Sequence, residues 1–387
     1  MKINKLFLTF VLVFCFSFNL FSEQSSALLK DFVAGNLNDK IHILKITKST
    51  PIESFVNENS FNFIESYYTL LENDDTFKEL ICLTIEGLPK KNTPRNADAL
   101  QRVFLHFEDE KIKIAVIEKI PQFEDNTDEL INLLNNFVKN SIQENTYESK
   151  IFLAAVKSLS ECAHPSSFHV LFSCYVANIS TQINEIVEKS LKTMAESNKA
   201  QIIAIIANNP PKEKLLALRI SNKKHTNNDY FSAEIAENAL AITINLTESK
   251  QDISEDLVTL QLEAMRIISE FSWTRASSLI IRYFDVAKQQ FKNNIISKND
   301  FIDVIVCMSR LATVEIGKTL ASYLGTLNLE TEKTGSYDKD IILAVINSLG
   351  VLGEKSAFDY LLYVISFSNY SEEIISASRD ALSRLKW

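Results

Sequence analysis

Few residues in this chain are of types that bind a metal or catalyse a reaction, and their spacing does not favour a shared site. Cys162, His164, His169 and Cys174 lie within 13 positions of one another, and thiolates and imidazoles are the ligands that zinc prefers. His169 and Cys174 are five residues apart, which on a helix separates their side chains by roughly 140° around the axis. We therefore interpret the four residues as two packed thiols, a turn histidine and a surface histidine, and we expect no metal.

Catalytic motifs are also missing from the sequence. It contains no His-Glu-x-x-His, Gly-x-Ser-x-Gly or Cys-x-x-Cys motif and no glycine-rich phosphate loop. His42, His106 and His225 have no plausible partner nearby in the sequence. We predict no catalytic residue and no cofactor, and we expect that the protein is not an enzyme.

The elements that must position any site are helices. The 387 residues are 46% hydrophobic, which provides material for a core, but include only 7 glycines and 7 prolines, well below usual usage. Every proline falls between segments with a helical apolar period, where it can begin or end a helix. Turn-rich β architectures are therefore disfavoured, and the sequence predicts an all-α fold.

The charge balance excludes one class of partner. The formal net charge is -9, whereas a polyanion is normally bound by a basic stripe. The nearest group of cations, Lys90, Lys91, Arg95 and Arg102, is scattered and is interpreted as a solvated loop and helix start. We expect no nucleic-acid partner.

The N-terminus has the order of a secretory signal peptide. Lys2 and Lys5 precede an apolar run from Leu6 to Phe18, and the small residue Ser22 is followed by Glu23. We predict cleavage after Ser22 and an exported, periplasmic or extracellular protein. An uncleaved segment that anchors the chain in a membrane is the alternative, and we expect no other membrane contact.

Four cysteines would remain after cleavage. Export would allow disulfides, but Cys162 and Cys174 fall at different heights on consecutive antiparallel helices, and Cys82 and Cys307 are remote in sequence. We interpret all four as small buried hydrophobic residues.

An apolar pattern i, i+3, i+12, i+16 recurs along the chain, as expected for two helices joined by a short turn. The first positions of three copies, Ile268, Met308 and Leu349, are spaced by 40 and 41 residues. The copies are Leu159/Cys162/Leu171/Tyr175, Leu191/Met194/Ile203/Ala207, Ile268/Phe271/Ile280/Phe284, Met308/Leu311/Leu320/Leu324 and Leu349/Leu352/Leu361/Ile365. The sequence thus predicts a repeated helical hairpin, with a longer loop from Glu330 to Lys339.

The segment from Ile341 to Leu385, with its runs Ala344 to Gly353 and Ala357 to Leu362, resembles HEAT repeats. The resemblance implies an α-solenoid of stacked hairpins of about 40 residues. The family's proline in the first helix and its Asp and Arg ladder are not consistently filled here, so an armadillo-like or unclassified α-solenoid remains an alternative.

The expected organisation has five parts. They are a signal peptide at 1–22, a helical region with degenerate repeats possible at 23–110, HEAT-like repeats at 111–208, a degenerate repeat or linker helices at 209–249, and HEAT-like repeats with a C-terminal capping helix at 250–387.

The same register predicts an exposed row on the second helix of each hairpin, at i+10 and i+14. Its members are His169 and Ser173, Gln201 and Ile205, Ser278 and Arg282, Lys318 and Ser322, and Asp359 and Tyr363. The resemblance to HEAT stacks implies that second helices line a concave face where partners dock. The candidate binding residues are therefore Ser278, Arg282, Lys318, Ser322, Asp359 and Tyr363. Arg282 and Tyr363 are the strongest candidates because Arg and Tyr are enriched in binding hot spots.

An α-solenoid usually holds another macromolecule on an extended surface. We therefore expect an exported scaffold or protein-binding protein that presents a curved helical surface to a partner in the cell envelope. A structural component of an envelope or motility assembly, or a HEAT-like enzyme or enzyme subunit, are the alternatives.

Overall fold

The computed structural model describes residues 27–50, 52–125, 127–147, 149–222, 229–249 and 254–386. The predicted signal peptide and His225 lie outside the described residues. The chain divides into two compact units, one up to Leu191 and one from Lys192 onward, and each is described by itself.

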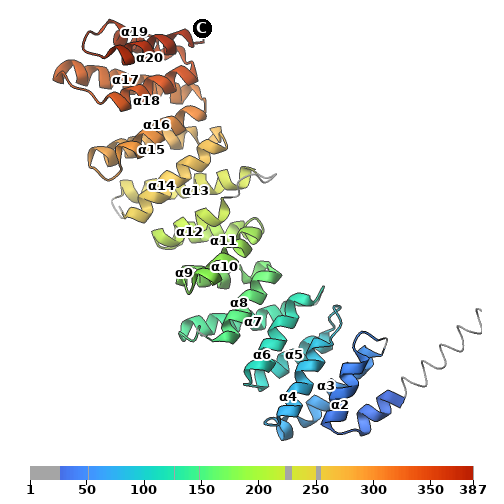
Figure 1. Ribbon diagram of the computed structural model, residues 1–387. Coiled ribbons are helices and arrows are strands. Elements are labelled where there is room, and N and C mark those ends of the chain that lie inside the picture. Colours follow the sequence, from blue (N-terminus) through green and yellow to red (C-terminus); the bar gives the residue numbers. More distant parts are fainter. Residues whose placement is uncertain are drawn as a thin grey trace, which may run out of the picture. The chain divides into compact units, whose positions relative to one another are not determined.

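The described residues form an all-α solenoid, as predicted (Figure 1). They contain no β-strand, and one isolated bridge joins Glu354 to Lys386. The first unit contains a helix at residues 27–34, then α2 (Leu37–Thr47), α3 (Glu53–Leu71), α4 (Asp75–Glu86), α5 (Pro94–His106), α6 (Glu110–Lys119), α7 (Asp128–Gln143), α8 (Lys150–Cys162) and α9 (Phe168–Ala177). Helix α10 (Thr181–Met194) spans the boundary between the units.

The second unit continues the alternation of helices. It contains α11 (Lys199–Asn208), α12 (Pro211–Ser221), α13 (Asp229–Glu248), α14 (Glu255–Glu270), α15 (Ser277–Lys292), α16 (Lys298–Arg310), α17 (Val314–Thr334), α18 (Lys339–Leu352), α19 (Phe358–Ser366) and α20 (Glu372–Ser383). Short 3₁₀ helices lie at Ile120–Gln122, Pro165–Ser167, Thr274–Ala276 and Lys355–Ala357.

Each unit has two layers of helices. In the second unit α12, α14, α16, α18 and α20 contact one another in series, and α11, α13, α15, α17 and α19 do the same. In the first unit the two series are α2, α4, α6 and α8, and α5, α7 and α9. The segment at 209–249 thus contributes one helix to each layer, α12 and α13, as a repeat does.

The repeated apolar anchors form the core between the layers. Leu349 and Leu361 are fully buried, as are Ile268, Ile280 and Phe284. The copy that begins at Leu191 has a different register from the one predicted: Ile202 and Ile206 are buried, while Ala207 is exposed. Every residue from Ile202 to Ile206 is apolar, so the run fits either register and contacts with neighbouring helices decide the face that is buried.

The predicted loop from Glu330 to Lys339 is mostly helix, which corrects that expectation. Helix α17 continues to Thr334, and Gly335 ends it with a φ of 68°. Its N–H donates to the carbonyl of Thr331. A left-handed residue at this position favours glycine because a Cβ would be strained. The connection to α18 therefore begins only at Gly335.

Ion pairs connect helices of the same layer in consecutive hairpins. Arg266 of α14 lies 2.6 Å from Asp303 of α16, and Lys298 of α16 lies 2.7 Å from Asp340 of α18. Similar pairs in the first unit are Lys45–Glu79, Arg95–Glu58 and Lys150–Glu110. These side chains are exposed or partly exposed, so solvent screens each pair and its contribution to stability is small.

Two buried lysines each donate hydrogen bonds to the last carbonyls of the helix that precedes their own. The ammonium of Lys214 donates to the carbonyls of Ile206 and Ala207 at the end of α11. Lys40 donates to the carbonyls of Phe32 and Val33 at the end of the helix at 27–34. The last carbonyls of a helix have no donor within the helix, and these lysines supply one.

No helix among the described residues is both long enough and apolar enough to span a membrane.

Candidate binding surface

The six candidate binding residues lie on three helices of one layer. Ser278 and Arg282 are on α15, Lys318 and Ser322 on α17, and Asp359 and Tyr363 on α19. These helices contact one another in series. Five of the six residues are exposed and Tyr363 is half-buried. The structure thus places the predicted row on consecutive helices of one layer.

The other members of the predicted row are less regular. His169 and Gln201 are exposed and Ser173 is half-buried. Ile205, predicted to be exposed, is only 7% exposed. That prediction is wrong because α11 adopts the alternative register described above, in which Ile205 faces the core.

The two strongest candidates already have contacts within the chain. The Arg282 Nε donates to Glu248 Oε1 at 2.8 Å, and its Nη2 donates to Asn245 Oδ1 at 2.8 Å. The hydrogen bond from Arg282 lowers the pKa of the Glu248 carboxyl. The Tyr363 ring stacks on Phe367, with 5.4 Å between ring centroids. A partner at Arg282 would therefore compete with Glu248 of α13.

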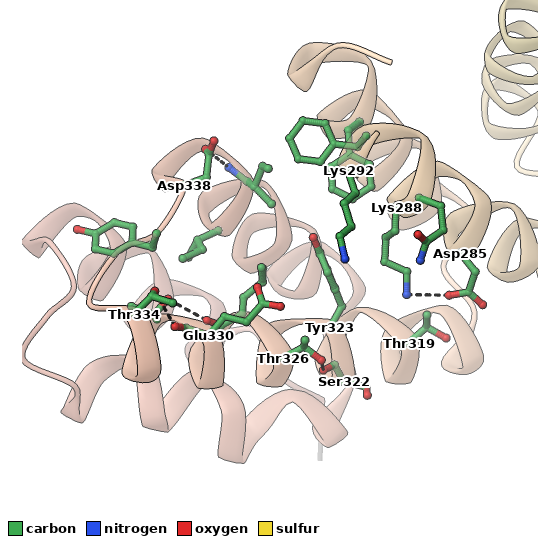
Figure 2. A pocket seen from close by; sticks show the side chains of 18 of the residues that line it. Asp285, Lys288, Lys292, Thr319, Ser322, Tyr323, Thr326, Glu330, Thr334 and Asp338 are labelled. Carbon is green, nitrogen blue, oxygen red and sulfur yellow. Dashed lines mark hydrogen bonds and ion pairs between the residues drawn. The ribbon is translucent and has the colours of Figure 1, made fainter. Parts of the chain in front are cut away.

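A groove lies next to Lys318 and Ser322 on this layer. It lies between α15 and α17, is closed at one end by the start of α18, and has a volume of about 1210 Å³ (Figure 2). Lys318 and Ser322 belong to its lining, together with Lys292 of α15 and Tyr323 and Glu330 of α17. The groove is thus continuous with the predicted row.

Stacked aromatic rings form the floor of the groove. Phe301 is stacked on Phe291, with ring centroids 4.9 Å apart, and on Phe284 at 5.9 Å. The Tyr323 ring meets Phe284 edge-on at 5.2 Å. Phe284 and Phe301 are fully buried. Because these rings are fixed by packing, the Tyr323 ring is held in one orientation.

The hydroxyl of Tyr323 is available to a ligand. Burial raises its pKa, as do the charges of Glu330 and Asp338, so the hydroxyl is protonated at neutral pH. It makes no hydrogen bond to any other described residue. Figure 2 shows the ends of the Tyr323 and Lys292 side chains directed toward the same space.

The charges of the groove are separated along its length. Lys288 is neutralised by Asp285, with 2.7 Å between Nζ and Oδ1. Within the described residues, Lys292, Lys318 and Glu330 take part in no ion pair. Lys318 lies at the start of α17, and Glu330 lies three turns further along the same helix. Along α17 the groove therefore has a cation, Lys318, near one end and an anion, Glu330, near the other, while the Lys292 side chain ends beside Tyr323 between them (Figure 2).

Sequence reasoning did not find Lys292, Tyr323 or Glu330. Tyr323 and Leu327 lie outside the i, i+3, i+12, i+16 positions and their neighbouring exposed row. Glu330 was assigned to a loop. For Glu330 the sequence signal was Gly335, at which a helix that includes Glu330 can end; Lys292 and Tyr323 had no such signal.

The cysteines and histidines form no site in the described part of the chain. No group of three or more potential ligands is placed to hold a metal ion there. Cys82, Cys162, Cys174 and Cys307 are free thiols, as predicted, with the first two half-buried and the others buried. Burial raises the pKa of Cys174 to about 12, which makes it unreactive at neutral pH.

His106 has a contact that the sequence did not indicate. Its ring meets Tyr68 of α3 edge-on, with centroids 4.3 Å apart. Both residues line a second pocket, of about 530 Å³, between α3 and α5. Its Nε2 is buried, and we find no hydrogen-bond partner for it among the described residues.

Comparisons with known proteins find no matching protein-family model and no matching curated protein. The fold therefore defines the class of this protein, an all-α solenoid of stacked helical hairpins.

Proposed function

We propose that this protein is an exported HEAT-like scaffold that binds a partner protein through the second-helix layer of its C-terminal hairpins. The observation that carries the proposal is the continuity of the exposed row on α15, α17 and α19 with the groove between α15 and α17. A rigid concave groove beside an exposed polar row is a common form of protein-binding surface in stacked-repeat proteins. The step from fold to partner binding is made by analogy with such proteins.

Two features support the HEAT-like assignment within the α-solenoids. Hairpins of about 40 residues recur at the C-terminus, where α14, α16 and α18 begin at Glu255, Lys298 and Lys339. Ion pairs such as Arg266–Asp303 join successive hairpins, in the manner of a polar ladder, although the residue types vary.

Export is the second part of the proposal, and it rests on Lys2, Lys5, the apolar run from Leu6 to Phe18, and Ser22. The mature chain would begin at Glu23 in the periplasm or outside the cell. Mass spectrometry of the protein isolated from its natural source tests this directly. A mature N-terminus at or near Glu23 supports export, whereas an intact Met1 in a cytoplasmic fraction contradicts it.

Site-specific photo-crosslinking in cells tests the binding surface. A photoreactive amino acid is placed at Ser322, in the groove on α17, and a matched control is placed at Asn347, which is exposed on α18 in the other layer. We expect a discrete adduct from Ser322 and none of the same mass from Asn347. Equal adducts from both positions, or an adduct from Asn347 alone, would contradict the proposed surface. An adduct at fixed stoichiometry under all conditions would favour a structural component over an exchangeable scaffold.

A further inference from the structure

The dimensions of the α15–α17 groove indicate the kind of occupant. Its lining on α17 runs from Lys318 to Thr334, which at 1.5 Å per residue is roughly 24 Å. An extended peptide of about seven residues covers that length. The volume of about 1210 Å³ also exceeds the roughly 300 to 1,000 Å³ of most small-molecule sites. The groove is therefore the size of a peptide segment.

The side chains along the groove indicate the chemistry of that segment. Lys292 and Lys318 supply unpaired cations, whereas Glu330 supplies an unpaired anion further along α17. Between Lys318 and Glu330 on α17 lie Tyr323 and Leu327, both half-buried. Tyr323 precedes Glu330 by seven residues, or roughly 10 Å along the helix axis, and Lys318 precedes it by roughly 18 Å. These distances correspond to about three and five or six residues of extended chain.

Polar groups are available for the main chain of such a segment. The hydroxyls of Thr319 and Thr326 donate to carbonyls of their own helix, at 2.8 and 3.3 Å, which leaves their oxygens free to accept. The Tyr323 hydroxyl can donate, as described above. An extended peptide exposes both N–H and C=O groups, and buried ones must find partners.

We propose that this groove binds a partner's peptide segment in which an acidic and a basic side chain lie three to six residues apart, with an aliphatic or aromatic side chain between them. An acidic side chain five or six residues from the basic one contacts Lys318, and one three residues from it contacts Lys292. The apolar side chain packs on Tyr323 and Leu327, and the basic side chain contacts Glu330. The opposite charges at the two ends set the direction of the segment. This inference rests on the proposed function and specifies the part of the partner that is recognised.

The overall charge of the protein sharpens this assignment. With a net charge of -9, the chain as a whole repels acidic peptides, so binding of one acidic side chain must come from the local lysines. A second acidic side chain near Glu330 would be repelled. The groove therefore discriminates against uniformly acidic segments as well as uniformly basic ones.

The test is a selection of random seven-residue peptides, displayed on phage, against the full-length protein and two variants. Glu330→Lys replaces the unpaired anion by a cation, and the double variant Lys292→Ala/Lys318→Ala removes both unpaired cations. Each substituted residue is exposed, and circular dichroism verifies that the helical content of the variants is unchanged. Individual peptides that emerge are then measured by fluorescence anisotropy at 50 and 300 mM salt.

The expected result is a change of specificity. Peptides selected on the wild type carry the acid–apolar–base order or its reverse, bind at least tenfold more weakly to both variants, and lose affinity at high salt. Selection on Glu330→Lys returns peptides in which a second acidic residue replaces the basic one. The inference is overturned if no peptide is enriched on the wild type, or if the enriched peptides bind all three proteins equally. Because the crosslink at Ser322 does not depend on the charge order, an adduct there together with a failed selection would remove this inference and leave the proposed function standing.

Discussion

The buried Lys214 provides a stringent test of how the hairpins are held together. Its side chain is 4% exposed, and its ammonium donates to the carbonyl of Ala207 at 2.8 Å and to that of Ile206. In Lys214→Met the aliphatic part of the side chain is kept and both hydrogen bonds are lost. Each buried carbonyl left without a donor costs about 1 to 3 kcal/mol, and removal of the buried charge offsets part of this cost. We expect a net loss of about 2 to 4 kcal/mol.

The assay is urea denaturation followed by circular dichroism, with Lys212→Met as the control. Lys212 lies two residues earlier on the same helix and is exposed, so its replacement should change stability by less than about 0.5 kcal/mol. If Lys214→Met is no more destabilising than this control, the lysine does not stabilise the end of α11, and the reasoning is refuted.

The pH dependence of the free energy of unfolding gives a second test, in which the wild type is compared with Lys214→Met. Burial lowers the pKa of Lys214 below its ordinary value of 10.5. At alkaline pH the unfolded chain therefore binds more protons at this residue than the folded chain. The contribution of Lys214 to the free energy of unfolding thus rises as the pH increases toward 10.5. The wild type should show this rise relative to Lys214→Met, and a difference that shrinks with increasing pH would contradict it.

Three further predictions address the core, the binding row and the thiols. Leu349→Ala should cost roughly 2 to 5 kcal/mol because the side chain is fully buried between hairpins. Val351→Ala, at a residue that is 63% exposed, is the control in urea denaturation, and equal losses would contradict the predicted core register. Arg282→Ala combined with Tyr363→Ala should leave the melting temperature nearly unchanged and weaken partner capture by about 1 kcal/mol or more per residue; capture at wild-type strength would exclude these two residues from the interface. Cys174, whose pKa burial raises to about 12, should resist iodoacetamide at pH 8 until the protein is denatured, and mass-spectrometric mapping of native alkylation there would contradict its burial.

The sequence alone was sufficient to predict the repeated hairpin and most of its register. Helix geometry is local, so residues three and four apart share a face whatever the rest of the chain does. The spacing of Ile268, Met308 and Leu349 therefore predicted three fully buried anchors, and each of them is buried. The same periodicity predicted the exposed positions of Lys318 and Ser322.

Only the tertiary structure decided the features that join one hairpin to another. The contact between Arg282 and Glu248 spans 34 residues, and no local period relates two such positions. The apolar run around Ile205 fits two registers, and only contacts with neighbouring helices select one. The lining of the α15–α17 groove extends along α17 as far as Thr334, whereas α15 ends at Lys292. Helical periodicity determines which face of each helix is apolar. The lengths and contacts of neighbouring helices determine where a groove lies between two helices of a layer.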